Sequence, residues 1–272
     1  MNVPATVCRR ALTVAYDGTM FRGWQVQSEG DTVQGELESA FRKIVGVDVR
    51  VIGSGRTDAG VHAIGQVAHF DDPKNLPSPR LRAALNAHLP PAIRVQQIHD
   101  VAPDFHALAE SVHKTYFYQL HLGGRAGEES GGEAPEQPWR QGFFHVVHGD
   151  LDVEAMRGAA AQLVGRRDFS ALSKVMDDDR GTVRTVMSVR VLRVPRGLRI
   201  FVTADGFLYG MVRLMSGLLV DVGRGAVAVD AIPDRLATQT SANRSPALPS
   251  RGLFLWRVCY PTSRSGRGGV LP

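Results

Sequence analysis

The order of secondary structure predicted over the first hundred residues restricts the possible folds of this chain more than any other feature. Strands are expected where apolar residues alternate with polar ones or cluster before a turn, and helices where they recur every three or four positions. The predicted elements are a strand at Leu12–Tyr16, a helix from Val33 to Ile44 capped by Thr32, strands at Val47–Ile52 and Gln66–Phe70, a helix from Ser78 to His88, and a strand at Ile93–Ile98. This order is that of the ferredoxin-like, split βαβ unit.

The second half of the chain repeats this order loosely. Its predicted elements are a strand at Lys114–Leu122, a helix at Val153–Val164, a hairpin of Thr182–Val194 and Leu198–Thr203 around Pro195-Arg196-Gly197, helices at Tyr209–Val222 and Ile232–Thr238, and a last strand at Leu253–Tyr260. We therefore predict an α+β protein with two ferredoxin-like, RRM-like halves, residues 1–109 and 110–272.

Two segments lack the apolar residues that a packed element requires. Gly123–Gln137 is polar and Gly-rich, which predicts a flexible surface insertion, and Arg264–Pro272 is expected to be a frayed tail. No apolar run approaches the roughly 20 residues of a membrane-spanning helix. Cys8 and Cys259 are too few for a disulfide framework, so we expect an intracellular, most simply cytoplasmic, setting, with an organelle left open.

The charge of the chain makes a nucleic acid a plausible partner. There are 32 basic against 27 acidic residues, and the isoelectric point is near 9.5. Of the basic residues 28 are Arg, a side chain that binds phosphate in a bidentate manner and stacks on bases. A GC-rich genome also produces Arg-rich proteins, so composition alone leaves both explanations open.

The segment from Gly53 to Ala63 (G-S-G-R-T-D-A-G-V-H-A) interrupts two apolar strands with glycines, an Arg and a carboxylate. Loops that a sheet holds in place are where catalytic groups concentrate, which makes Asp58 a candidate. The structural alternative is that Asp58 only caps its own turn, as Asp before a Gly often does. The chain has neither a G-x-S-x-G nucleophile elbow nor a Gly-Lys-Ser/Thr phosphate loop. His62 and His69 are seven residues apart on a predicted strand and face opposite ways, so they do not predict a metal site.

Two residues of the second half are further candidates, each with a good structural explanation. Tyr116 and Tyr118 share one face of a predicted strand, where either ring is suited to a core or to a platform for a base. On the predicted helix 209–222, Arg213 projects away from the apolar face, on the side of Gly210 and Gly217, where the missing side chains permit close approach. A solvated Arg on a polar face fits the same pattern.

The sequence G-R-T-D-A-G-V-H-A, followed by G-Q-V-A-H-F, resembles the signature of the tRNA pseudouridine synthase A family. The resemblance covers about residues 11 to 260, and other segments agree in the family's order. These segments are Tyr16–Gln25 (Y-D-G-T-M-F-R-G-W-Q), Thr32–Gln34, Leu85–Pro90 (L-N-A-H-L-P), Asp104–Ala107, Lys114–Tyr118 (K-T-Y-F-Y), Arg167–Ser170 and Phe207–Arg213 (F-L-Y-G-M-V-R). The chain departs from the family at Leu108, where an Arg is common, and this bears on the choice of substrate.

The resemblance implies a fold in which two ferredoxin-like halves share a mostly antiparallel sheet around a central RNA-binding cleft. It implies that Asp58 is the nucleophile, which adds to the target uridine at C1′ or C6 or helps to form a glycal. It places Arg213 beside Asp58, to orient the carboxylate and keep it ionised, and Tyr116 as the aromatic platform for the uracil. We expect Arg56 to bind phosphate or the flipped nucleotide, and no metal, nucleotide or redox cofactor to be consumed.

The expected function is that of an isomerase that converts uridine to pseudouridine in the anticodon stem-loop of tRNA, at nucleotides 38 to 40, as a homodimer. One alternative is a pseudouridine synthase for another RNA or an organellar tRNA. The other is a noncatalytic RNA-binding protein, which an RNP-type aromatic strand would favour, and the sequence contains none.

Overall fold

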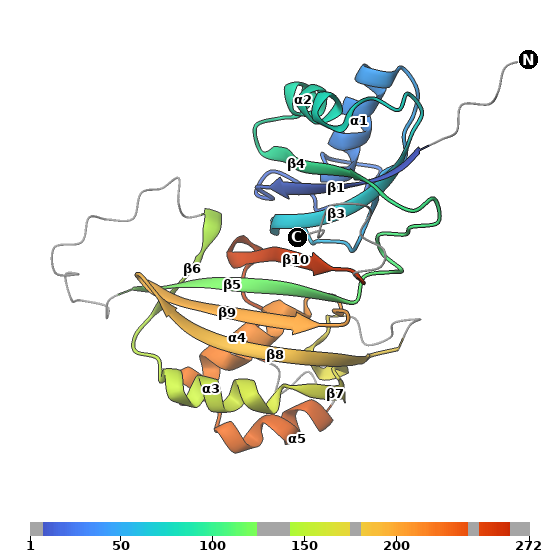
Figure 1. The fold of residues 1–272 in the computed structure, drawn as a ribbon. Coiled ribbons are helices and arrows are strands. Elements are labelled where there is room, and N and C mark those ends of the chain that lie inside the picture. Colours follow the sequence, from blue (N-terminus) through green and yellow to red (C-terminus); the bar gives the residue numbers. More distant parts are fainter. Residues whose placement is uncertain (1–7, 124–141, 175–180, 239–244, 262–272) are drawn as a thin grey trace, which may run out of the picture. The chain divides into compact units, whose positions relative to one another are not determined.

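The computed structural model describes residues 8–123, 142–174, 181–238 and 245–261 (Figure 1). The chain divides into two compact units: unit 1 comprises the residues up to Lys114 and those from Leu255 onward, and unit 2 comprises Thr115–Phe254. The first division falls shortly after the boundary expected at residue 109. The predicted tail at 264–272 and the predicted insertion at 123–137, apart from Gly123, lie outside the described residues. Within the described part, the fold is mixed α+β with five α-helices and mostly antiparallel strand pairing.

Unit 1 has the predicted order of elements. These are β1 (Cys8–Tyr16), α1 (Val33–Val45), β2 (Ile52–Gly53), β3 (His62–Asp72), α2 (Ser78–His88) and β4 (Ile93–Asp100). Strand β1 lies between β4 and β3 and is antiparallel to both, and the short β2 pairs with β3. Strand β10 (Leu253–Cys259) follows β3 in the strand order. The description of both halves as ferredoxin-like stays a prediction.

Helix α1 forms where the sequence predicts it, because its two ends are capped and one face is apolar. The Thr32 hydroxyl accepts a hydrogen bond from the Gly35 amide, and Gly46 ends the helix with φ 78°. Leu37 and Phe41 are buried, and the Phe41 ring lies 4.6 Å from that of Phe70 on β3. This packing joins α1 to the strands of unit 1.

The strand predicted at Val47–Ile52 is wrong, except for Ile52, which begins β2. Val49 and Val51 are buried, as the alternating pattern predicts, but the backbone of Val51 bonds to α1 rather than to a strand. Its amide donates to the Glu38 carboxylate at 3.0 Å and its carbonyl accepts from the Gln34 amide at 2.9 Å. Two helix side chains therefore take the place of a neighbouring strand.

Unit 2 contains the elements predicted for the second half except the last strand, β10, which belongs to unit 1 from Leu255 onward, and it has two short strands that were not predicted. The predicted ones are β5 (His113–Gly123), α3 (Val153–Gln162), β8 (Val183–Val194), β9 (Gly197–Ala204), α4 (Met211–Gly223) and α5 (Ile232–Ala237). The others are β6 (His145–His148), parallel to β5, and β7 (Gly165–Asp168), antiparallel to β8. The strand order is β5-β9-β8-β7, and Figure 1 shows α3 and α5 below β8.

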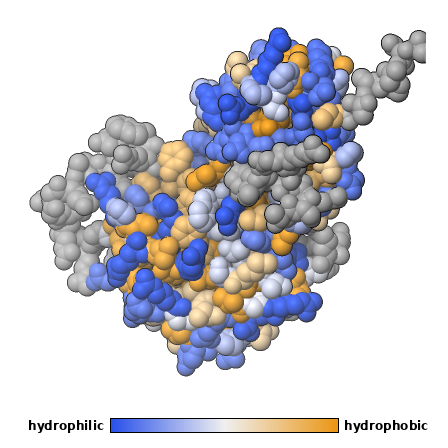
Figure 2. Space-filling view, viewed as in Figure 1, coloured by the Kyte–Doolittle hydropathy of each residue, from blue (hydrophilic) through white to orange (hydrophobic). Residues whose placement is uncertain are grey.

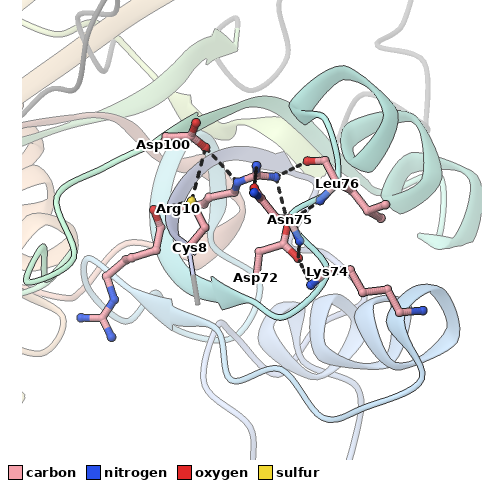
Figure 3. Close-up of polar contacts among 8 residues, drawn as sticks. Cys8, Arg10, Asp72, Lys74, Asn75, Leu76 and Asp100 are labelled. Atoms are coloured by element: carbon pink, nitrogen blue, oxygen red, sulfur yellow. Dashed lines mark hydrogen bonds and ion pairs between the residues drawn. The ribbon is translucent and has the colours of Figure 1, made fainter. Parts of the chain in front are cut away.

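A buried ion pair ties the start of β1 to the turn that follows β3 (Figure 3). Arg10 and Asp72 are 3% and 1% exposed, and Nη1 of Arg10 lies 2.9 Å from the Asp72 carboxylate. Nη2 of Arg10 donates to the Asn75 side chain, and its Nε lies 2.8 Å from the carboxylate of Asp100 on β4. The other Asp72 oxygen accepts the amides of Lys74 and Asn75, so this pair organises the turn.

The visible surface is predominantly hydrophilic over unit 1 and carries more apolar patches over unit 2 (Figure 2). The exposed large apolar side chains of unit 2 include Phe143, Met187 and Leu192. None of the helices in the described ranges is long and apolar enough to cross a membrane.

Candidate active site

The Asp58 loop runs from β2 to the start of β3 and carries two of the candidate residues. Arg56 is exposed, and its Nε donates to the Gln25 side chain at 3.1 Å. Asp58 is half-buried and opens a turn in which the Val61 amide donates to the Asp58 carbonyl at 3.1 Å. Gly60 has φ 74° within this turn, a backbone conformation that L side chains rarely adopt. The loop therefore carries the carboxylate and the guanidinium two residues apart, as the sequence predicts.

The segment from Gly18 to Trp24 packs along this loop backbone to backbone. The Trp24 amide donates to the Thr57 carbonyl at 3.1 Å, and the Gly60 amide donates to the Phe21 carbonyl at 3.3 Å. A Cβ atom at Gly18 would lie 2.0 Å from the Val61 carbonyl oxygen, and one at Gly23 would lie 2.4 Å from that of Thr57. These two glycines are required for the close approach.

Buried polar side chains support the loop from the adjoining strands. The phenol of Tyr16, at the end of β1, lies 2.8 Å from the Thr57 hydroxyl. Gln66 of β3 donates its amide to the Gly55 carbonyl at 2.9 Å and accepts the Ser54 hydroxyl at 2.7 Å. In the sequence, Tyr16 and Gln66 stand out only as parts of motifs. The signal that could have identified them is a polar side chain at the end of one apolar strand, β1, and inside another, β3.

The two histidines of β3 are buried, and each accepts a hydrogen bond from a backbone amide. His62 is 1% exposed and its Nδ1 accepts the Gly18 amide at 3.0 Å. His69 is 3% exposed and its Nδ1 accepts the Ala107 amide at 3.1 Å. The Asp17 carboxylate also lies 3.2 Å from Nδ1 of His62, but that nitrogen cannot accept the Gly18 amide and donate a proton at once, so this contact is not a hydrogen bond.

Lys114 is a buried cation beside the loop that sequence reasoning missed. It is 8% exposed, its ammonium donates to the Ser111 hydroxyl at 2.8 Å, and its Cε would lie 3.5 Å from a Cβ atom at Gly55. Lysines are seldom buried, so this position is unusual for its residue type. The signal in the sequence is a Lys immediately before the apolar run of β5.

The other two candidates lie in unit 2. Tyr116 is 7% exposed, and its ring meets that of Phe207 edge to face, with 5.0 Å between centroids. Tyr118 lies on the same face of β5, is fully buried and donates its hydroxyl to the Pro249 carbonyl at 2.6 Å. Tyr118 is therefore a core residue, while Tyr116 packs against the segment that leads into α4.

Arg213 is not a solvated side chain on a polar face. It is half-buried in the first turn of α4, and its Nε donates to the Leu248 carbonyl at 2.6 Å. A Cβ atom at Gly217, one turn further, would lie 2.0 Å from the Pro246 carbonyl oxygen, so segment 246–248 covers this side of the helix. The predicted close approach at Gly217 is confirmed, and α4 is buried on more sides than its apolar face predicts.

In chemical terms, unit 1 presents a carboxylate and a guanidinium on one loop, and unit 2 presents an aromatic ring and a second guanidinium. Within the described parts of the chain, no group of three or more His, Cys, Asp or Glu side chains is arranged to hold a metal ion. A carboxylate on a loop fixed by buried bonds is suited to nucleophilic attack, because its orientation is set before the substrate binds.

Comparison with known proteins identifies the class to which this fold and loop belong. The model of the tRNA pseudouridine synthase family matches residues 12–108 and 159–261, ranges that contain Asp58 and Arg213. The chain belongs to the tRNA pseudouridine synthase family. Its relatives include the tRNA pseudouridine synthase A of Brevibacillus brevis, 37% identical over 93% of this chain and 99% of the relative. That of Bacillus pumilus is 39% identical over 91% of this chain and 97% of the relative.

Proposed function

We propose that this protein isomerises uridine to pseudouridine in the anticodon stem-loop of tRNA, with Asp58 as the nucleophile. The observation that carries the proposal is the Asp58 loop. It lies within the range that matches the family model, and it holds the Asp58 carboxylate on a tightly bonded, half-buried turn. An Asp carboxylate has an ordinary pKa of about 3.9, so it is ionised at neutral pH and needs no separate base.

The reaction that we propose rearranges one nucleotide and consumes nothing else. Asp58 adds to the uridine at C1′ or C6, or assists in forming a glycal, and the N-glycosidic bond breaks. The uracil then turns within the pocket and C5 becomes bonded to C1′. Any bond to Asp58 breaks as the product forms, the hydrogen on C5 leaves as a proton, and N1 takes up a proton. The target base must leave its stack to reach the carboxylate, at a cost of a few kcal/mol.

The other candidate residues have supporting roles in this proposal. Tyr116 provides the aromatic surface that holds the detached uracil, supported by its edge-to-face contact with Phe207. Arg213 supplies the positive charge that keeps the Asp58 carboxylate ionised. Arg56, which is exposed, binds a phosphate or the flipped nucleotide of the substrate.

We further propose that the enzyme acts as a homodimer in the cytoplasm. The net charge of +5 and the 28 Arg residues support a polyanionic substrate. Another RNA as the substrate is the second candidate function, and Leu108 favours it: this residue is 41% exposed, so the position at which the family commonly has an Arg is open to an RNA.

Release of tritium from tRNA transcripts labelled at uridine C5 tests the proposal. Wild-type protein should release tritium, and Asp58→Ala should release none while its affinity for tRNA stays within about threefold, because one carboxylate contributes little to binding a polyanion. Carbodiimide treatment followed by primer extension then maps the modified nucleotides to the anticodon arm.

The matched control is Asp71→Ala, which removes an exposed carboxylate of the same unit and should leave release unchanged. Turnover by Asp58→Ala would show that this residue is not the nucleophile. Tritium release with primer-extension stops outside the anticodon arm would support the proposed reaction but show that the enzyme modifies other nucleotides.

A further inference from the structure

The backbone of the Asp58 loop is held from two sides. Backbone hydrogen bonds tie it to the segment Gly18–Trp24. From the sheet, it is held by the side chains of Tyr16 of β1 and Gln66 of β3 and by the Val67 carbonyl. Because β1 and β3 pair with each other along most of their length, both side chains project from a rigid base.

Tyr16 reaches the residue next to the nucleophile. Its phenol is 4% exposed and lies 2.8 Å from the hydroxyl of Thr57, which is 6% exposed. Burial raises the pKa of this phenol, against the smaller opposing effect of its hydrogen bonds to Thr57 and Gln66, so the hydroxyl keeps its proton. A buried hydroxyl pair of this kind fixes the χ1 angle of Thr57 and with it the local backbone.

Gln66 holds the other end of the same loop. It is fully buried, and one amide group joins two consecutive loop residues, Ser54 through its oxygen and Gly55 through its nitrogen. The Ser54 amide adds a bond to the Val67 carbonyl at 2.7 Å, beside Gln66 on β3. The four residues before Asp58 are therefore bonded to the sheet at positions 54, 55 and 57, while Arg56 is left exposed.

We propose that Tyr16 and Gln66 are positioning residues, which hold Thr57 and Gly55 and through them orient the Asp58 carboxylate for attack. Neither residue touches the uridine in this proposal, which rests on the proposed role of Asp58 as the nucleophile. Small displacements of a reacting group lower rates strongly, and a shift of about 1 Å costs about a hundredfold. Loss of either anchor should therefore lower the rate of the chemical step more than the affinity for RNA.

The test is single-turnover kinetics on a tRNA transcript with the isosteric change Thr57→Val and with Tyr16→Phe, which retains the ring. Each should lower the maximal rate about ten- to a hundredfold, with the Kd for tRNA within about threefold. Thr57→Ser keeps the hydroxyl and should retain the rate within about threefold. The double variant Tyr16→Phe/Thr57→Val should be no slower than the slower single variant, because both changes remove the same bond.

Asn86→Ala is the control for a loss of stability alone. The Asn86 side chain makes two hydrogen bonds to the Val95 backbone in the same unit, remote in sequence from the loop. Its melting temperature should fall at least as far as that of Thr57→Val, while its maximal rate stays within about twofold of wild type.

Retention of the maximal rate within threefold by both Tyr16→Phe and Thr57→Val would overturn the inference. So would independent, multiplicative losses in the double variant, or an equal loss of rate in Asn86→Ala. Failure of the proposed function has a different signature: Asp58→Ala would stay active, and there would be no nucleophile at this position to orient.

Discussion

At the scale of single residues, neighbouring side chains of the same type have different environments because successive residues of a strand face opposite sides. Arg9 and Asp71 form an exposed pair across β1 and β3, and Arg10 and Asp72, one residue further along each strand, form a buried one. The sequence shows that these four charged residues lie next to predicted strands. It does not show which of the two Arg–Asp pairs the sheet buries. Their contributions to stability should differ accordingly.

Asp72→Asn should lower the free energy of unfolding by about 2 kcal/mol, because it removes the buried one of the two carboxylates that pair with Arg10 and leaves only the exposed Asp100. Asp71→Asn removes an exposed pair and should cost less than about 1 kcal/mol. Urea unfolding of both variants at neutral pH measures the difference. Equal losses would mean that the Arg10–Asp72 pair is not the tie between β1 and the turn.

Arg213→Gln should shift the acid limb of the pH–rate profile upward. In the proposed mechanism the Arg213 charge lowers the pKa of Asp58, so its removal raises that pKa and the ionised carboxylate is lost at a higher pH. Single-turnover rates of wild type and variant, measured from about pH 3 to 8, compare the two limbs. An unchanged profile would show that Arg213 does not affect the ionisation of Asp58. Its bond with the Leu248 carbonyl would then indicate a structural role.

At the scale of elements, the sequence predicts the helices and strands that form through interactions between neighbouring residues. It does not predict those that depend on hydrogen bonds to residues far away in the sequence. Helix α1 has its own cap and apolar face, and the β8–β9 hairpin has its turn at Arg196, which adopts φ 66°. Strand β7 (G-R-R-D) has no alternation, and the Val51 backbone bonds to α1 side chains, so neither feature could be inferred locally. The Asp58 loop was recognised from its motif, but its bond to Tyr16 spans 41 residues and has no local signature.

His69 joins β3 to the segment at Ala107 and gives this link a dependence on pH. Burial, together with the charges of His106 and Arg9, lowers its pKa to about 4. Since an unfolded His titrates near 6.5, the unfolded state binds more protons between pH 6.5 and 4, and stability decreases as the pH falls through this range.

His69→Asn keeps an acceptor for the Ala107 amide and removes this titration. Between pH 7.5 and 5 the wild type should lose about 2 kcal/mol of stability more than the variant. Urea unfolding at the two pH values measures the difference. Parallel losses in both proteins would show that His69 does not couple protons to folding.

At the scale of the whole molecule, binding of tRNA should depend on ionic strength. A chain of net charge +5 that contacts several phosphates releases their counterions, so the logarithm of its affinity should fall linearly with the logarithm of salt concentration. Arg56→Ala should reduce this slope by about one if Arg56 binds a phosphate, while Asp58→Ala should leave it unchanged. Filter binding across a series of salt concentrations gives both slopes.

Unit 1 is assembled from both ends of the described chain, with the residues of β10 from Leu255 packed beside β3. A Cβ atom at Gly65 of β3 would lie 2.6 Å from the Trp256 carbonyl oxygen, which shows how closely the two segments meet. During synthesis on the ribosome the Asp58 loop emerges early, whereas β10 emerges only after all of unit 2. The unit that carries the proposed nucleophile is therefore completed last, and a chain that stops before β10 leaves the part of β3 around Gly65 without its neighbouring strand on that edge.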